Sequence, residues 1–342
     1  MGKLKIINPG PLTTIQDEGR DGYMRYGMPT SGAVDKFAFK VANLLVGNNE
    51  SAAVLETAFL GPEIQFKSDA IIAITGADMQ PLLDNHPINM WQAIRVEKGS
   101  RLSFASLQDG LRAYIAIGGG IDLPAVMDSK STYLKAKIGG LEGRKLKEGD
   151  VLKFFSNNLE AKQVVNQPLP EMLIPQYSEK NEVKVILGPQ DDYFSQADIE
   201  KFLNSEYKFS NRSDRMGCML EGPTLKHKKS PDIISDGIAM GAIQVPGHGK
   251  PIIMLSDRQT TGGYAKIANV TTTDLMKVAQ AKPGDVISFK AVSVKEAQKD
   301  LRKQAKELKQ IKEFIQEERK LKRKFLKVKV NDKTYQVEIE EI

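Results

Sequence analysis

Most apolar residues of the chain fall in short runs separated by turns rich in glycine and proline. Each run is too short for a typical helix, and a short apolar run bounded by turn residues is typical of a strand. The predicted strands include residues 70–75, 93–97, 101–106, 112–117, 183–187 and 251–255. This spacing indicates a mainly β fold with short helices.

Residues 36–46 have the apolar spacing of a helix. Ser31 or Asp35 is suited to cap its start, and Gly47 to end it. The free N–H groups of such a helix start can bind an anion, although an ordinary cap is an equal explanation. Asp191 is expected to cap a second helix over residues 191–203.

The last fifty residues differ from the body. Leu301, Leu308 and Ile315 recur seven residues apart in a segment rich in Lys and Glu, which predicts an amphipathic helix over residues 294–325. Such a helix either binds a partner or packs on its own body. A hairpin around Asn331-Asp332 is expected to follow.

The charge lies in the same segment. Residues 295–324 hold twelve Lys or Arg against six Asp or Glu, which accounts for the net charge of +6 of the whole chain. A basic groove on the globular body is therefore not indicated, and we expect no nucleic-acid partner.

Cysteine and histidine limit the chemistry. The single cysteine, Cys218, excludes an intrachain disulfide and is expected to be a buried thiol. The three histidines are far apart in sequence, so we expect no metal site. No apolar run approaches the length of about 18 residues that spans a bilayer, and no signal peptide is recognisable at the start. These features predict a cytoplasmic protein without a membrane partner.

The polar run of residues 256–264 is the strongest candidate for chemistry. It follows the buried strand 251–255 directly and ends in the glycine pair Gly262-Gly263, so it gathers donors and acceptors at one strand end. A structural turn with an Asp257–Arg258 ion pair is the alternative. Residues 13–20 have a similar composition. Glu56, in an otherwise apolar run, is expected to be paired or functional because an unpaired buried carboxylate is costly.

Six motifs together resemble a known family. In chain order they are GPLTTIQDEGR (10–20), PTSGAVD (29–35), ANLLVGN (42–48), GGGID (118–122), SDRMG (213–217) and DRQTTGGY (257–264). They are similar to the biotin-dependent carboxyltransferase family, also called the allophanate hydrolase subunit 2 family. That family includes the C subunit of bacterial 5-oxoprolinase and the antagonist of the sporulation kinase-A inhibitor.

The resemblance implies a fold and a domain order. It implies two cyclophilin-like β-barrel domains, at residues 1–160 and 182–293, joined by a linker at 161–181. The helix at 294–325 and the hairpin at 326–342 would follow, and the hairpin is similar to the first part of a biotin-carrier domain. The Ala-Met-Lys-Met biotinylation motif is absent, so we expect no biotin attached to this chain.

The resemblance also implies an activity. The expected function is that of the C subunit of an ATP-dependent 5-oxoprolinase, a hydrolase that opens 5-oxoproline to glutamate only as part of a complex. ATP would be the cosubstrate of that complex, and the partners would be its A subunit and its kinase-inhibitor-like B subunit. The alternatives are a regulatory protein that antagonises a kinase inhibitor, or a carboxyltransferase component that works on a separate biotin carrier.

Residue chemistry within the matching motifs gives the candidate site. Arginines would bind a carboxylate or a developing oxyanion, amides and hydroxyls would bind the lactam, and a carboxylate would orient an arginine or act as a base. The catalytic candidates are Asp17, Asp257 and Gln259. The substrate-binding candidates are Gln16, Arg20, Ser31, Asp35, Arg215, Arg258, Thr261 and Gly262.

Overall fold

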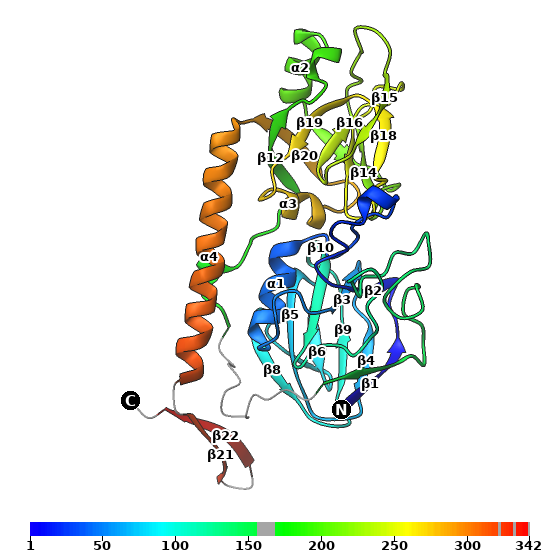
Figure 1. Cartoon of the computed structure of the whole chain (residues 1–342). Helices are drawn as coiled ribbons and strands as arrows, with labels where there is room; N and C mark the ends of the chain where they lie inside the picture. The colour runs from blue at the N-terminus through cyan, green and yellow to red at the C-terminus, as the bar shows by residue number, and fades with distance from the viewer. Residues whose placement is uncertain (156–167, 321–322, 331–332, 341–342) are drawn as a thin grey trace.

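The computed structural model of the protein describes residues 1–155, 168–320, 323–330 and 333–340. The described chain is mostly β, as the sequence predicts, and its two halves lie one above the other with a long helix beside them (Figure 1). Part of the expected linker, residues 161–167, lies outside the described residues. So does Asn331-Asp332 at the expected hairpin turn.

The first half consists of two antiparallel sheets packed face to face. One has the strand order β11 (Val151–Phe154), β1 (Gly2–Asn8), β4 (Glu63–Phe66), β9 (Arg101–Phe104), β6 (Pro81–Leu83) and β7 (His86–Pro87). The other has the order β2 (Leu12–Gln16), β3 (Val54–Ala58), β10 (Asp109–Ile117), β5 (Ala70–Asp78) and β8 (Ala93–Val96). Apolar side chains from both sheets form the core between them, which excludes water and stabilises the pair.

The five-stranded sheet is buried on both faces. Alternate residues of β10 point to opposite faces, so Ile115 and Ile117 enter the inter-sheet core while Tyr114 and Ala116 face α1 (Lys36–Leu45). Asp35 caps α1 and Gly47 follows its end in a left-handed conformation, which confirms the predicted helix. A strand buried on both faces reads as a continuous apolar run, and that explains why β5 and β10 stand out in the sequence.

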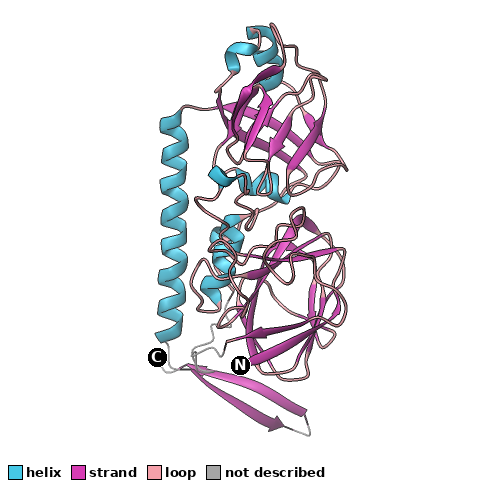
Figure 2. Cartoon of the chain, turned by 45° about the vertical axis from the view of Figure 1, so that its right-hand side comes forward, coloured by secondary structure: helices cyan, strands magenta, loops and turns pink. Residues whose placement is uncertain are grey.

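The second half contains a closed seven-stranded barrel (Figure 2). Its strand order is β12 (Lys180–Leu187), β19 (Lys266–Val270), β16 (Ala242–Gln244), β17 (Ile252–Met254), β14 (Gly217–Glu221), β13 (Tyr207–Phe209) and β20 (Val286–Ala291). A separate two-stranded ribbon is formed by β15 (Asp232–Gly237) and β18 (Thr261–Tyr264). Val34 of the first half is part of the second half's core, so the two halves share packed side chains.

The remaining elements are helical. They are α2 (Gln196–Leu203), α3 (Leu275–Gln280), α4 (Val294–Lys320) and the short 3-10 turns Met24–Tyr26, Glu171–Leu173 and Asp191–Tyr193. The expectation that Asp191 caps α2 is wrong. Residues Asp191–Tyr193 form their own 3-10 turn, and Ser195 caps α2 by accepting a hydrogen bond from the Asp198 amide.

Helix α4 runs along the side of the molecule, next to both halves (Figures 1 and 2). Ile311 and Ile315 are buried in the cluster that contains α1, and Arg319 Nη2 donates to the carbonyls of Leu44 and Leu45 at the end of α1. A cation at a helix C-terminus is favourable because the free carbonyls there carry partial negative charge. Of the two alternatives, this half of the helix therefore packs on its own body.

After α4 the chain forms an antiparallel hairpin of β21 (Arg323–Val330) and β22 (Lys333–Glu340). The register pairs Val330 with Lys333, the described residues on either side of positions 331–332. The first strand begins at Arg323, within the range 294–325 assigned to the helix from the sequence.

Candidate functional site at the junction of the two halves

Loops from both halves meet at one place. The loop after β2 holds the loop before α1, because the Arg20 amide donates to the Thr30 carbonyl at 2.7 Å and the Ala33 amide donates to the Asp17 carbonyl at 2.9 Å. The second of these loops reaches the other half, since the Ser31 amide donates to the Ser256 carbonyl at 3.0 Å. The predicted polar runs around residues 13–20, 31–35 and 256–258 are therefore brought together.

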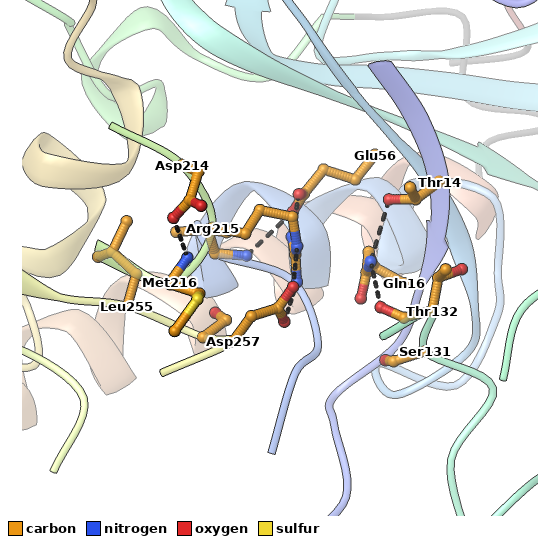
Figure 3. Close-up of polar contacts among 12 residues, drawn as sticks. Thr14, Gln16, Glu56, Ser131, Thr132, Asp214, Arg215, Met216, Leu255 and Asp257 are labelled. Carbon is orange, nitrogen blue, oxygen red and sulfur yellow. Dashed lines mark hydrogen bonds and ion pairs between the residues drawn. The ribbon is translucent and has the colours of Figure 1, made fainter. Parts of the chain in front are cut away.

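Arg215 lies between the two halves and binds carboxylates from both (Figure 3). Its Nη1 donates to Glu56 of β3 in a short contact, and its Nε donates to Asp257 Oδ2 at 3.1 Å. Nη2 donates to the Gly32 carbonyl at 2.7 Å and to Asp257 Oδ1 at 3.2 Å. The expectation that Glu56 is paired is confirmed. The alternative ion pair between Asp257 and Arg258 is wrong, because Asp257 pairs with Arg215.

The charge of Arg215 is fixed by this arrangement. Burial acts to lower the pKa of Arg215, but Asp257 and Glu56 outweigh it and raise the pKa above the usual arginine value. Glu56 also accepts a hydrogen bond from the Val34 amide at 3.0 Å. Most donors of Arg215 are thus used by protein acceptors, and its main physical effect is to join the halves.

Asp17 is held by a segment that the sequence prediction did not include. Its carboxylate accepts hydrogen bonds from Ser129 Oγ at 2.6 Å, from the Lys130 amide at 2.5 Å and, in a short contact, from Ser131 Oγ. The only sequence signal was the polar run Ser129–Thr132, which has no known spacing. These hydrogen bonds fix the orientation of the carboxylate.

Several buried polar atoms near Asp17 have no partner in the described structure. They are Gln16 Oε1, Arg20 Nη1, Ser31 Oγ and Thr132 Oγ1. Gln16 Nε2 donates to Thr14 Oγ1 at 3.0 Å and to the Thr132 carbonyl at 3.2 Å, which ties β2 to the Ser129–Thr132 segment (Figure 3). Buried polar groups are normally hydrogen-bonded, so unsatisfied atoms gathered in one region indicate a place where a ligand can supply partners.

Arg20 and Arg258 are buried guanidinium groups without a salt bridge among the described residues. Burial lowers the pKa of Arg20, while Asp17 and Asp257 act at longer range to raise it. Burial also lowers the pKa of Arg258, whose Nε donates to the Ile238 carbonyl at 2.8 Å and whose Nη1 donates to Thr30 Oγ1 at 3.3 Å. A buried cation without a carboxylate partner is costly, and an anionic ligand would lower that cost.

Asp35 performs a different task. Its Oδ1 accepts hydrogen bonds from the amides of Phe37 and Ala38, both at 3.1 Å, and so caps α1. Its Oδ2 accepts from Gln280 Nε2 at 2.8 Å and from Tyr177 Oη at 3.1 Å. Burial raises the pKa of Asp35, and these hydrogen bonds offset only part of the effect. Gln280 belongs to α3, so this carboxylate is also a contact between the halves.

The other candidates lie apart from the buried cluster. Gln259 and Thr261 are exposed. Gly262 lies in the ribbon strand β18, where a Cβ atom would come within 2.5 Å of Ile238 Cδ1 and 2.8 Å of Gln244 Nε2. The glycine is therefore required for close packing of the ribbon on the barrel. The roles assigned to all eleven candidate residues stay predictions.

A cavity of about 790 Å³ lies near the junction but is separate from these residues. Its lining includes Trp91, Asp78, Asp109 and Tyr177. Tyr177 connects it to the site through its hydrogen bond to Asp35. Among the described residues, no group of three or more His, Cys, Asp or Glu side chains could hold a metal ion. No helix of the described chain is long and apolar enough to cross a membrane.

Comparison with known proteins gives the family. Residues 26–291 match the model of the carboxyltransferase domain, subdomains A and B. The chain belongs to this family. Two of its relatives are named as the C subunit of 5-oxoprolinase. The protein of Escherichia coli K12 is 38% identical over 296 residues, covering 86% of this chain and 93% of the relative. The protein of Haemophilus influenzae is 35% identical over 314 residues, covering 92% and 99%.

Members with larger chains are also similar. Urea amidolyase of Saccharomyces cerevisiae is 39% identical over 306 residues, but the match covers only 17% of that protein. The crystal structure of Kluyveromyces lactis urea amidolyase superposes with a TM-score of 0.85 at 33% identity, covering 90% of this chain and 20% of the larger one. The carboxyltransferase family fold is thus shared with enzymes of which this chain corresponds to one part.

Proposed function

We propose that this carboxyltransferase-family chain is the C subunit of an ATP-dependent 5-oxoprolinase, which opens 5-oxoproline to glutamate together with its A and B subunits. The observation that carries this proposal is the share of each relative's length that the chain matches. The match spans 93% and 99% of the two relatives named as the 5-oxoprolinase C subunit, whereas it spans 17% of urea amidolyase. A complex of this kind would work in the cytoplasm, with ATP as its cosubstrate.

The junction supports this chemistry. Opening a lactam places negative charge on the amide oxygen, so preorganised donors lower the barrier. Arg20 and Arg258 are buried guanidinium groups without a salt bridge among the described residues, and each can bind an anionic oxygen. Gln16 Oε1 can accept a hydrogen bond from an amide, and Ser31 Oγ can accept or donate one. Asp17 and Asp257 hold the surrounding loops, Asp17 through Ser129 and Ser131 and Asp257 through Arg215.

The proposal is tested with the assembled complex. Purified chain is mixed with the candidate A and B subunits, and 5-oxoproline-dependent ATP hydrolysis and glutamate formation are measured. We expect activity only with all three proteins, and Arg258→Ala is expected to reduce kcat/KM at least about 100-fold through loss of a charged donor. Arg212→Ala, on an exposed arginine, is the control and should retain full activity. Absence of 5-oxoproline turnover in an intact three-protein complex would contradict the proposal.

A second function has its own observation. The fold superposes on urea amidolyase with a TM-score of 0.85, which favours a carboxyltransferase component that accepts CO₂ units from a separate biotin carrier. Carboxylation of urea by this chain, supplied with a biotin carboxylase and a biotinylated carrier protein, would establish this second function. Failure of that assay alongside ATP-dependent glutamate formation would exclude it.

A further inference from the structure

Lys266 is a buried ammonium group on the outer face of the second barrel. Its chain neighbours Ala265 and Ile267 belong to the barrel core, whereas the Lys266 side chain, at the start of β19, reaches the ribbon outside the barrel. It is nevertheless only 3% exposed. Its Nζ donates to Asp236 Oδ2 at 3.0 Å and to the Gly237 carbonyl at 3.4 Å, and both acceptors belong to the ribbon strand β15.

Gln244 lies next to Lys266, and its side-chain nitrogen lacks a partner among the described residues. The two residues are Cα partners in the β16–β19 pair, and Gln244 is also buried. Its Nε2 has no hydrogen-bond acceptor among the described residues. The same atom would be 2.8 Å from a Cβ at Gly262, and Gly262 is the Cα partner of Asp236 in the ribbon. Two donors on the barrel thus face the ribbon, and only one of them has an acceptor.

Asp236 accepts a hydrogen bond from only one of these two donors. Its Oδ2 accepts from Lys266, while its Oδ1 accepts from its own neighbour, the Gly237 amide, at 2.7 Å. Its side chain is 55% exposed, in contrast to the buried lysine. The acceptor belongs to a two-stranded ribbon, an element of low independent stability. A carboxylate with both oxygens free would satisfy Lys266 and Gln244 together.

We propose that the barrel face under the ribbon is a binding site for the carboxylate of a small organic acid. In this site one carboxylate accepts hydrogen bonds from Lys266 Nζ and Gln244 Nε2, and it takes the place that the Asp236 carboxylate occupies in this structure. The site adjoins the junction, because Ile238, which contacts the position of a Gly262 Cβ, also accepts a hydrogen bond from Arg258 Nε. The choice of 5-oxoproline as the acid rests on the proposed function, whereas the carboxylate site itself does not.

The test compares 5-oxoproline with 2-pyrrolidone, the same lactam without a carboxylate, by calorimetric titration of the full chain. Asp236→Asn removes the competing negative charge at nearly constant shape, so 5-oxoproline should bind about tenfold more tightly than to the wild type. Asp232→Asn, at the other end of the same strand, is the matched control and should leave the affinity unchanged. 2-Pyrrolidone should respond to neither substitution.

The Gln244→Leu variant distinguishes a loss of ligand binding from a loss of stability. Removing an unsatisfied buried amide should leave the unfolding midpoint equal or higher, yet 5-oxoproline affinity should fall about tenfold. Lys266→Met should abolish the preference for 5-oxoproline over 2-pyrrolidone. Affinities unchanged by Gln244→Leu and Asp236→Asn would overturn the site and show Asp236–Lys266 to be only a ribbon contact.

The same variants distinguish this inference from the proposed function. Acetate and glutamate are included as further carboxylate probes. Binding of any of these probes that depends on Gln244 and Lys266 supports the site even if the complex does not open 5-oxoproline. Full 5-oxoprolinase activity in complexes with Gln244→Leu, together with affinities for all of these probes that do not depend on Gln244 or Lys266, would support the function and overturn the site.

Discussion

Arg215 and Glu56, 159 positions apart in the chain, form a buried ion pair that joins the two halves of the protein. Asp257 completes the cluster from the same half as Arg215. The hydrogen bonds of the Arg215 guanidinium to these two carboxylates and to the Gly32 carbonyl fix how β3 of the first half meets the loops of the barrel. The geometry of the candidate site therefore depends on a contact that neither half contains by itself.

Arg215→Met is expected to lower the free energy of unfolding by about 3–5 kcal/mol, because it leaves Glu56 and Asp257 buried without a counter-charge. Urea denaturation followed by circular dichroism measures the change. Arg212→Met, three residues earlier and exposed, is the control and should stay within about 0.5 kcal/mol of the wild type. Equal stability of the two variants would contradict a structural role for the Arg215 cluster.

Gln280→Ala should destabilise the contact between α3 and the first half. The side-chain oxygen of Gln280 accepts from the amides of Leu111 and Arg112, at 3.0 and 2.9 Å, and its Nε2 donates to Asp35 at 2.8 Å. Loss of the amide leaves buried donors unsatisfied, which costs about 1–3 kcal/mol each.

Chemical denaturation tests this expectation, with the exposed Gln196→Ala as the control. The Gln196 variant should change the free energy of unfolding by less than about 0.5 kcal/mol. A Gln280 variant as stable as the wild type would mean that water replaces the lost hydrogen bonds.

Asp35 should make stability depend on pH. Because burial raises its pKa in the folded protein, the folded state binds the proton more tightly than the unfolded state. The contribution of Asp35 is therefore fully present below the ordinary carboxyl pKa of about 4 and is lost as pH rises through the raised folded value. Relative to Asp35→Asn, which retains a capping oxygen, the wild type should gain stability as the pH falls from 7 towards 4.

The measurement is the free energy of unfolding of both proteins across this pH range. Only the difference between the two curves reports on Asp35, because the other titrating groups are common to both. A parallel pair of curves would contradict the prediction, because it would show that the Asp35 carboxyl has the same pKa in the folded and unfolded protein.

Substitutions in the two halves of α4 should change the stability of the protein by different amounts. Ile311 is fully buried against the α1 cluster, so Ile311→Ala is expected to cost about 2–5 kcal/mol. Leu301 is 45% exposed, and Leu301→Ala should cost less than about 1 kcal/mol. Thermal unfolding of both variants measures this difference. A larger loss for Leu301 than for Ile311 would indicate that the first turns of the helix make the more important contact.

The local sequence determined several elements of the fold and the burial of several side chains. Short-range patterns and the cost of burying charge predict several features correctly. They are the strands at residues 70–75 and 112–117, the α1 helix with its Asp35 cap, the buried Cys218 thiol and the pairing of Glu56. The limits of α2 and α4 did not follow. Asp191 and Ser195 are both good caps, and the contacts of the surrounding chain decided between them.

Tertiary structure alone decided which polar residues meet. The motif around residues 257–264 predicted a site, but it gave no indication that Asp257 binds Arg215 rather than its neighbour Arg258. Nor did it indicate that Ser129 and Ser131 hold Asp17, or that Gln244 and Lys266 lie beneath the ribbon. Capping and alternation act within a few residues and can be read locally. An ion pair across 159 positions exists only because the two halves pack together, with Val34 of the first half buried in the core of the second, and so bring β3 to the barrel loops.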